Sequence, residues 1–164
     1  MAGDTTLTGR LVCEADIRLD DDAPLALGRS PWRSRRVSYI AGGTVTGPLL
    51  NGEVLPGGGD WAEGGQAADG TFLTLVEVRS LWKTHDGAMI YVTYTGRLVI
   101  PAATLPDFRD PAKVEGLPED SYYFRIQPTF ETSDERYAWL NAAVAVGYGR
   151  RTAKGVRYRI VALD

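Results

Sequence analysis

The alternation of large and small, apolar and polar side chains is clearest in Thr71–Lys83. Successive side chains of a strand point to opposite faces, so this segment predicts a strand with large residues on both faces. Asp86-Gly87 is a hairpin-turn signal, and Ala88–Ile100 is the expected partner strand. The two faces of Thr71–Lys83 are Leu73, Leu75, Glu77, Arg79 and Leu81, and Phe72, Thr74, Val76, Val78 and Trp82.

Shorter runs of the same kind predict further strands on either side of this hairpin. We expect Gly42-Gly43 to end the second strand, Val45–Leu50 to be irregular or an edge, and Pro128 to interrupt a later strand. The last two runs are expected to pair as a hairpin across Gly149–Gly155. These expected strands are Thr6–Asp16, Arg35–Ile40, Gly52–Leu55, Tyr122–Glu131, Leu140–Tyr148 and Val156–Leu163.

Three segments carry turn signals instead of strand patterns. Leu19–Pro31, with its aspartates, glycine and prolines, is expected to be a loop. Pro101–Asp120 contains four prolines, which excludes a long helix and leaves a short helix or a lid over a barrel mouth. Glu135–Trp139 is expected to form one helical turn or to lead straight into a strand. With roughly eight short strands, the pattern predicts one all-β domain spanning residues 1–164, an antiparallel β-barrel with a central ligand cavity.

Composition and net charge limit the partners and the cellular compartment that we expect for this protein. The 164 residues carry a net charge of −3, which argues against nucleic-acid binding. Basic clusters, such as Arg150, Arg151 and Lys154, indicate solvated loop charge, with an anion-binding patch as the alternative. Cys13 is the one cysteine and is expected to be a buried small hydrophobe. The start, Met1–Asp4, lacks the pattern of a signal peptide, and no run is long enough to span a membrane, so we expect a cytoplasmic protein.

The residue types also exclude several chemistries. His85 is the one histidine, and a zinc site takes several His or Cys ligands, so we expect no metal. A Ser-His-Asp or Cys-His arrangement would have to use His85, which precedes a turn and is expected at the surface. The glycine-rich run Pro56–Asp60 does not lead into a helix, so no nucleotide cofactor is expected.

That glycine-rich run is the most unusual stretch of the chain. Three consecutive glycines, Gly57-Gly58-Gly59, allow backbone angles closed to other residues and are followed by Asp60 and Trp61. We expect the glycines to bend the chain at the rim of the barrel, with Asp60 and Trp61 lining its mouth. The alternative is a flexible hairpin tip in which Asp60 is a turn residue.

Further polar side chains stand on predicted strands. Glu77 and Arg79 share a face with leucines, and they are either used in a cavity or paired on an outer face against which the leucines meet a lid or a second subunit. Tyr122–Glu131 has one polar face, which lines a cavity if it points inward and is the wet side if it points outward, the usual case. That face carries Tyr123, Arg125, Gln127, Thr129 and Glu131, and a later face carries Trp139 and Asn141 with Ala143, Ala145 and Gly147.

At this point the residues resemble a known family, the small bacterial and fungal family "domain of unknown function 3237". The resemblance runs from about Thr8 to about Ala162, and several blocks in order make it specific. It implies a lipocalin-like or allene-oxide-cyclase-like β-barrel, a homodimer and a ligand cavity, and barrels of this shape include cofactor-free cyclases of natural-product intermediates. Asp107–Asp120 has no family-specific pattern, whereas Glu77 stands where the family has an acid. The blocks are Arg35-Arg36, Gly42-Gly43, Gly47-Pro48, Gly52–Trp61, Asp69-Gly70, Thr84–Tyr91, Tyr123–Arg125, Phe130–Thr132, Tyr137–Asn141 and Gly147–Arg150.

Two functions fit these expectations best. The first is a cofactor-independent cyclase, isomerase or lyase acting on a hydrophobic, oxygen-bearing small molecule, including ring closure of a polyketide-type intermediate. The alternative is a non-catalytic small-molecule carrier, and a solidly packed interaction module is a third interpretation. The expected catalytic residues are Asp60 or Glu131 as general acid/base and Arg125 to polarise an oxygen. The expected substrate-binding residues are Arg36, Trp61, Glu77, Arg79, Tyr94, Tyr123, Thr129, Trp139 and Asn141.

Overall fold

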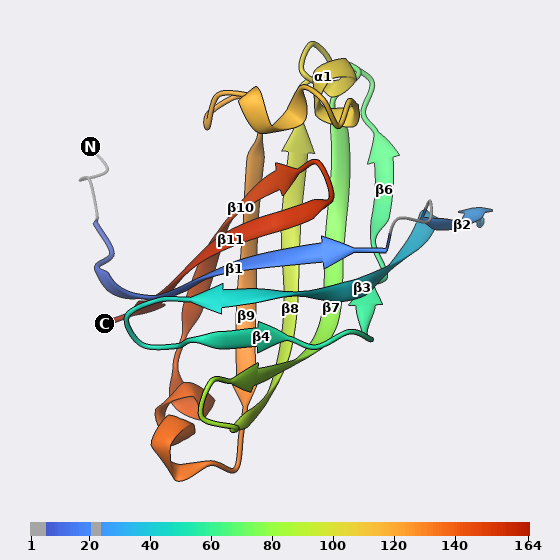
Figure 1. Cartoon of the computed structure of the whole chain (residues 1–164). Helices are drawn as coiled ribbons and strands as arrows, with labels where there is room; N and C mark the ends of the chain where they lie inside the picture. The colour runs from blue at the N-terminus through green and yellow to red at the C-terminus, as the bar shows by residue number, and fades with distance from the viewer. Residues whose placement is uncertain (1–5, 21–23) are drawn as a thin grey trace.

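A computed structural model describes residues 6–20 and 24–164. Met1–Asp4, on which the expectation of no signal peptide rests, and part of the expected loop Leu19–Pro31 lie outside the described residues. The strands are β1 (Gly9–Leu19), β2 (Leu25–Arg29), β3 (Ser34–Thr46), β4 (Gly52–Val54), β5 (Gly59–Asp60), β6 (Glu63–Gln66), β7 (Phe72–Thr84), β8 (Met89–Ile100), β9 (Tyr123–Glu131), β10 (Ala145–Thr152) and β11 (Gly155–Leu163) (Figure 1).

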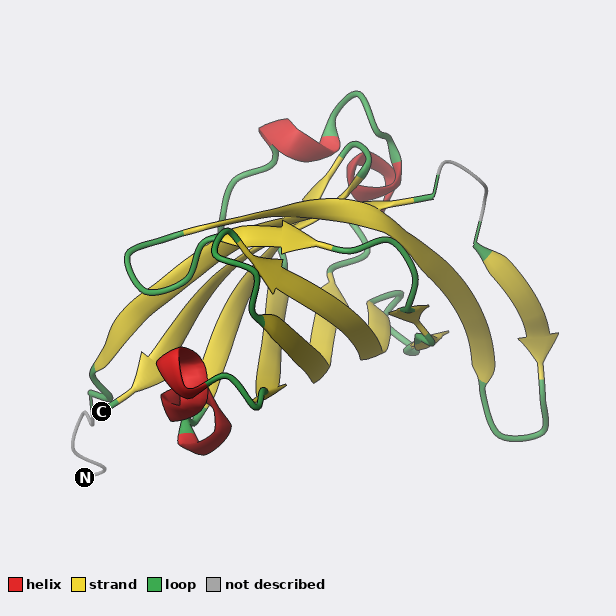
Figure 2. Ribbon diagram, turned by 60° about the horizontal axis from the view of Figure 1, so that its bottom comes forward, coloured by secondary structure: helices red, strands yellow, loops and turns green. Residues whose placement is uncertain are grey.

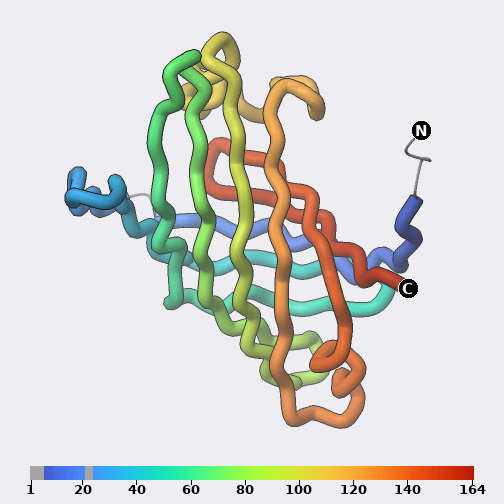
Figure 3. Tube along the Cα trace, turned by 180° about the vertical axis from the view of Figure 1, so that it is seen from behind, coloured from blue at the N-terminus to red at the C-terminus, as the bar shows by residue number. Residues whose placement is uncertain are grey.

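The sheet closes on itself, as the pattern predicted. Neighbours run β1-β11-β10-β9-β8-β7 and then through β4 to β3, and β1 pairs with β3 as well as with β11. The wall between β3 and β7 is one interrupted strand, because β4, β5 and β6 each pair with both of them. The result is a closed barrel of eight antiparallel strands (Figure 3). Closure leaves its strands no free edges and encloses an interior wide enough for one small ligand.

The β7–β8 hairpin shows why the alternation was informative. Phe72 pairs with Ile100 and Lys83 with Met89 in an unbroken register, and the turn at Asp86-Gly87 has a positive φ at Gly87. The face of β7 that carries Val76, Val78 and Trp82 is buried, whereas the leucine face is exposed. The barrel core is therefore built from one parity of each strand.

Short helices cover the two ends of the barrel. Helix α1 (Leu105–Arg109) and the 3₁₀ turn η1 (Val114–Gly116) lie at one end, and the 3₁₀ helix η2 (Glu135–Ala142) lies at the other (Figure 1). Leu105 and Phe108 are the buried residues of α1. The expected short helix within the proline-rich segment is thus present, and it covers the cavity described below.

Several expected boundaries were wrong. The segment expected to be a loop contains β2, which pairs with the start of β3 and projects from the barrel (Figure 2). Its residues are all exposed, so no apolar pattern marks it. Gly42-Gly43 does not end β3. A Cβ at Gly43 would stand 2.3 Å from the carbonyl oxygen of Asp16, so the glycine lets β3 and β1 approach closely and the strand continues.

The later strands also differ from expectation. Pro128 does not interrupt β9, because the pairing with β10 covers only Arg125 and Ile126 and leaves the proline beyond it. Residues 140–142, expected to begin a strand, belong to η2, and β10 starts at Ala145. The final hairpin is present, with its turn at Ala153-Lys154. Among the residues that the structure describes, no helix has both the length and the apolar character needed to cross a membrane.

Candidate functional site

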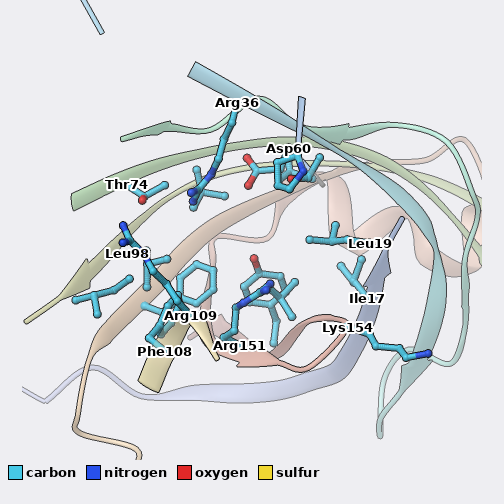
Figure 4. A pocket seen from close by; sticks show the side chains of 18 of the residues that line it. Ile17, Leu19, Arg36, Asp60, Thr74, Leu98, Phe108, Arg109, Arg151 and Lys154 are labelled. Atoms are coloured by element: carbon cyan, nitrogen blue, oxygen red, sulfur yellow. The ribbon is translucent and has the colours of Figure 1, made fainter. Parts of the chain in front are cut away.

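The barrel encloses a cavity of about 370 Å³ beneath α1 (Figure 4). Its wall is mostly apolar and comes from strands on all sides and from α1, including Ile17, Ile40, Phe72, Leu98, Phe108 and Phe124. This volume falls in the range of ordinary small-molecule pockets. The turn between β10 and β11, with Ala153 and Lys154, and the segment around Asp20 and Pro24 also line it.

Asp60 is the acid inside the wall. Residue Asp60 lies opposite Ser38 of β3 and Val78 of β7, and the backbone N–H of Glu77 donates to its Oδ1 (3.1 Å). Burial raises the pKa of Asp60 to about 6, against the lowering effects of the Glu77 N–H and the Arg36 guanidinium. The carboxyl group can therefore gain or lose a proton close to neutral pH, as a general acid or base must.

The glycine run places Asp60, although not by bending at a rim. Gly57 and Gly58 have φ of 96° and 75° and form a break within the wall, between β4 and β5. The Gly57 N–H donates to the carbonyl oxygen of Ile40 (3.0 Å). A Cβ added at Gly58 would stand 2.2 Å from the carbonyl oxygen of Arg79. The break shifts the chain so that Asp60 lines the cavity while Trp61 does not.

Arg36 and Tyr94, two of the residues proposed from the sequence to bind substrate, also line the cavity. Burial is the main cause that lowers the pKa of Arg36, whereas the charge of Asp60 raises it. The ring of Tyr94 meets Tyr158 edge to face, with centroids 5.3 Å apart, and burial raises the pKa of both phenols. Both therefore stay neutral and can donate hydrogen bonds.

The polar face of β9 points outward, away from Asp60. Arg125 lies between the rings of Tyr123 and Tyr148, with its Cζ 4.9 and 4.3 Å from their centroids. The Oγ1 atoms of Thr129 and Thr93 are 2.7 Å apart on the same exposed face, and Glu131 is exposed. The side chains facing inward are instead the apolar ones of the other parity, as is usual for a clean alternation. Arg125 and Glu131 therefore do not meet Asp60 in one site.

Trp61, Glu77 and Arg79 lie together on the outer surface beside β5. The Glu77 carboxylate is 3.4 Å from Arg79 and 3.7 Å from Arg35, and the Arg79 guanidinium lies 5.7 Å from the Trp61 ring centroid. Of the two arrangements considered for this charged pair, the structure has the outer one. The pairing accounts for two charges on a leucine-rich face.

Trp139 and Asn141 lie on η2, at the end of the barrel opposite α1. Asn141 Oδ1 accepts from the N–H of Thr132 and its Nδ2 donates to the carbonyl oxygen of Thr132, both at 2.9 Å. Trp139 is half-buried against the core. The hydrogen bonds of Asn141 hold η2 against the residue that follows β9. Neither Trp139 nor Asn141 lines the cavity.

Sequence reasoning missed several cavity residues, among them Arg109, Arg151 and Thr74. The Thr74 Oγ1 is buried, and no hydrogen-bond partner stands near it among the described residues. The basic cluster around Arg151 is not simply solvated loop charge, because Arg151 lines the cavity. In β10, alternate residues face inward, namely Ala145, Gly147, Gly149 and Arg151. This alternation could be read from the sequence, and it places Arg151 in the cavity.

Two other groups bear on the chemistry. Cys13 is buried, as expected, and burial raises the pKa of its thiol to about 12, which leaves it unreactive. His85 is exposed, with Nδ1 3.4 Å from the carbonyl oxygen of Asn51. Asp60 is therefore the acid–base group that the geometry favours in the cavity.

Fold and cavity together define a β-barrel protein with a ligand-sized site in its interior that contains one half-buried acid. The chain belongs to the family described as "Protein of unknown function (DUF3237)", whose model matches residues 8–163. It is 36% identical over 153 residues to a UPF0311 protein of Bradyrhizobium diazoefficiens, covering 92% of this chain and 93% of that one.

Solved structures agree on the architecture. A "beta-barrel like protein" from Acinetobacter baumannii superposes with a TM-score of 0.78 at 32% identity, covering 100% of both chains. The crystal structure of "an enzyme from Penicillium herquei" covers 100% of both chains with a TM-score of 0.63. At 21% identity, that second likeness shows the shared fold alone.

Proposed function

We propose that this protein is a cofactor-independent enzyme that cyclises, isomerises or eliminates within one hydrophobic, oxygen-bearing small molecule. The observation that carries the proposal is the carboxyl group of Asp60, which lies in the wall of a cavity of about 370 Å³ with its pKa raised by burial to about 6. Groups tuned in this way gather at active sites. The same cavity argues against a solidly packed interaction module.

The proposed chemistry needs a proton carrier and a group that stabilises negative charge. Asp60 removes a proton from the substrate, the Arg36 guanidinium stabilises the oxygen anion that forms, and Asp60 returns the proton to another atom. In a ring closure, the deprotonated oxygen adds to one carbon of a C=C bond conjugated to a carbonyl in the same molecule. The π bond breaks, its electron pair moves onto the carbonyl oxygen as an enolate, and Asp60 returns the proton to the enolate carbon. No electrons are gained or lost overall, so the sequence of steps needs no redox cofactor. The apolar wall excludes water and holds a folded conformer of the substrate.

A natural-product intermediate of the polyketide type would suit this cavity, since such molecules combine rigid apolar bodies with several oxygens. The similar fold of a fungal protein described as an enzyme is consistent with catalysis on this architecture and supplies no reaction. We further propose that the protein acts in the cytoplasm without nucleic-acid partners, which its single, buried cysteine and its net charge of −3 support.

The test begins by finding a ligand and then asks which acid converts it. Native mass spectrometry of the protein incubated with a small-molecule extract identifies what it retains, and turnover is then measured for wild type, D60N and E131Q. We expect D60N to lower kcat by about 100-fold or more, whereas E131Q, on the outer face, stays within about twofold.

Three outcomes are informative. If the wild type retains a ligand without converting it, the result favours the alternative function, a non-catalytic small-molecule carrier. Undiminished turnover by D60N removes Asp60 from the mechanism, and loss of turnover in E131Q alone would return the catalytic site to the outer face.

A further inference from the structure

We propose that the ligand of this cavity carries an anionic oxygen group, a carboxylate, phenolate or enolate, held by Arg36, Arg109 and Arg151 on a shelf of aromatic and aliphatic side chains. The inference rests on the proposed function only in taking the cavity as the binding site. It adds the charge class of the ligand and the place where its charge binds.

Positively charged side chains outnumber negatively charged ones in the described lining of the cavity. Among the described residues, four cationic ones line the cavity, Arg36, Arg109, Arg151 and Lys154, against the carboxylates of Asp20 and Asp60. The cations come from β3, α1 and the β10–β11 hairpin, which are far apart in sequence. Figure 4 shows Arg36, Arg109 and Arg151 around the same cavity, which all three line. A chain with a net charge of −3 thus concentrates positive charge inside its barrel.

These arginines differ in their partners from several arginines on the barrel surface. Arg79, Arg136 and Arg157 each form an ion pair within 4 Å of a carboxylate. Within the described part of the chain, no carboxylate oxygen comes that close to a guanidinium of Arg36, Arg109 or Arg151. Among the described residues, the guanidinium groups of this cluster form one hydrogen bond, which is long, from Arg151 Nη1 to the carbonyl oxygen of Gly155 (3.5 Å).

The cluster is held at an energetic cost. Arg36 and Arg151 are half-buried, and burial, followed by the charge of Arg36, lowers the pKa of Arg151. Burial is likewise the main cause that lowers the pKa of Arg36; the charge of Asp60 raises that pKa, and the charge of Arg109 lowers it by a smaller amount. Half-buried like charges without partners are uncommon because they are unfavourable, and an anion between them would relieve the repulsion. Planar guanidinium groups also suit carboxylate and related oxyanions in particular.

The remaining lining indicates where the ligand body lies. The Arg109 guanidinium lies 5.4 Å from the centroid of the Phe72 ring, and Leu98 and Phe108 stand beside them. The unpaired hydroxyl of Thr74, among the described residues, faces the same region and can bond a second oxygen of the ligand. The anion would therefore lie at the arginines and the apolar body along Phe72, Leu98 and Phe108.

Two fluorescent probes that differ by one anionic group test the proposal. 1-Anilinonaphthalene-8-sulfonate carries a sulfonate on an apolar body, and N-phenyl-1-naphthylamine is the same body without it. We expect the wild type to bind the sulfonate at least about tenfold more tightly than the neutral probe at low salt. R151Q and R109Q should remove most of that difference, while R159Q, an exposed arginine on β11, should keep it.

A melting curve separates ligand binding from a structural role. Removing one member of a like-charge cluster should leave the melting temperature of ligand-free R151Q equal to or above that of the wild type, whereas a structural arginine would lower it. The proposal is overturned if both probes bind equally, if R159Q behaves like R151Q, or if R151Q unfolds at lower temperature. Binding of the neutral probe alone would overturn only the anion inference, and binding of neither probe would overturn the cavity as a site as well.

Discussion

At the scale of single residues, the proposed function depends on Asp60. Its side chain is half-buried and accepts one backbone N–H, and the charge of Arg36 offsets only part of the cost of burial. Of the acids proposed from the sequence, it is the one inside the barrel, whereas Glu131 is exposed. A strand pattern gives the two faces of β9, but only closure of the sheet decides which face points inward.

The raised pKa of Asp60 makes a prediction about stability. The folded-state pKa of about 6 lies above the ordinary value of 3.8, so folding disfavours the ionised form. The resulting destabilisation is fully present above pH 6 and disappears as the pH falls from about 6 to below 4. D60N should therefore be more stable than the wild type at pH 8, by at most about 3 kcal/mol, and most of this advantage should be lost near pH 4. Urea unfolding at both pH values measures it, and an equal loss of stability at both would contradict it.

The catalytic rate should depend on the same carboxyl group of Asp60. Ionisation of this group lowers the stability of the fold but should raise the rate. Because the proposed base is the ionised carboxylate, kcat/KM should fall about tenfold per pH unit below pH 6. The residual activity of D60N should not show this dependence. A rate profile measured between about pH 4.5 and 8 tests it, and an unchanged profile in D60N would assign the titration to another group.

Elements differ in how much of them the sequence could reveal. The β7–β8 hairpin was predictable because one parity is buried along its whole length and a turn residue marks its end. The β2 strand was not, because its residues are exposed and only its pairing with β3 defines it. The three pieces β4, β5 and β6 make one wall strand, because the glycines that break the strand pattern in sequence also let the pieces follow one another in space.

Gly58 tests that explanation of the interrupted wall. Its φ is 75° and a Cβ would stand 2.2 Å from the carbonyl oxygen of Arg79, so G58A should cost about 3 kcal/mol or more. Gly57 has φ of 96°, but a Cβ added there would meet no atom within 4 Å, so G57A should cost only about 1–2 kcal/mol of backbone strain. Chemical denaturation of both variants measures the difference. Equal costs would show that contact with β7 does not constrain the break.

At the scale of the whole molecule, the outer face of β7 suggests self-association. Leu73, Leu75 and Leu81 are 46%, 37% and 46% exposed, and no lid covers them in the described part of the chain. We propose that a second copy of the chain binds this face and forms a homodimer. Sedimentation velocity at about 50 µM should show a dimer for the wild type and a monomer for L75E. A wild-type monomer at that concentration would contradict the proposal, and R159Q, on another face, serves as the control.

The central claim is that a proton-active acid and an anion-binding cluster share one interior cavity. A ¹³C NMR titration of the Asp60 carboxyl group, with and without 1-anilinonaphthalene-8-sulfonate, tests both parts together. We predict a midpoint near pH 6 in the free protein and a higher midpoint with the sulfonate bound, because a second negative charge nearby disfavours ionisation. A midpoint near pH 4 that the sulfonate does not move would contradict the account.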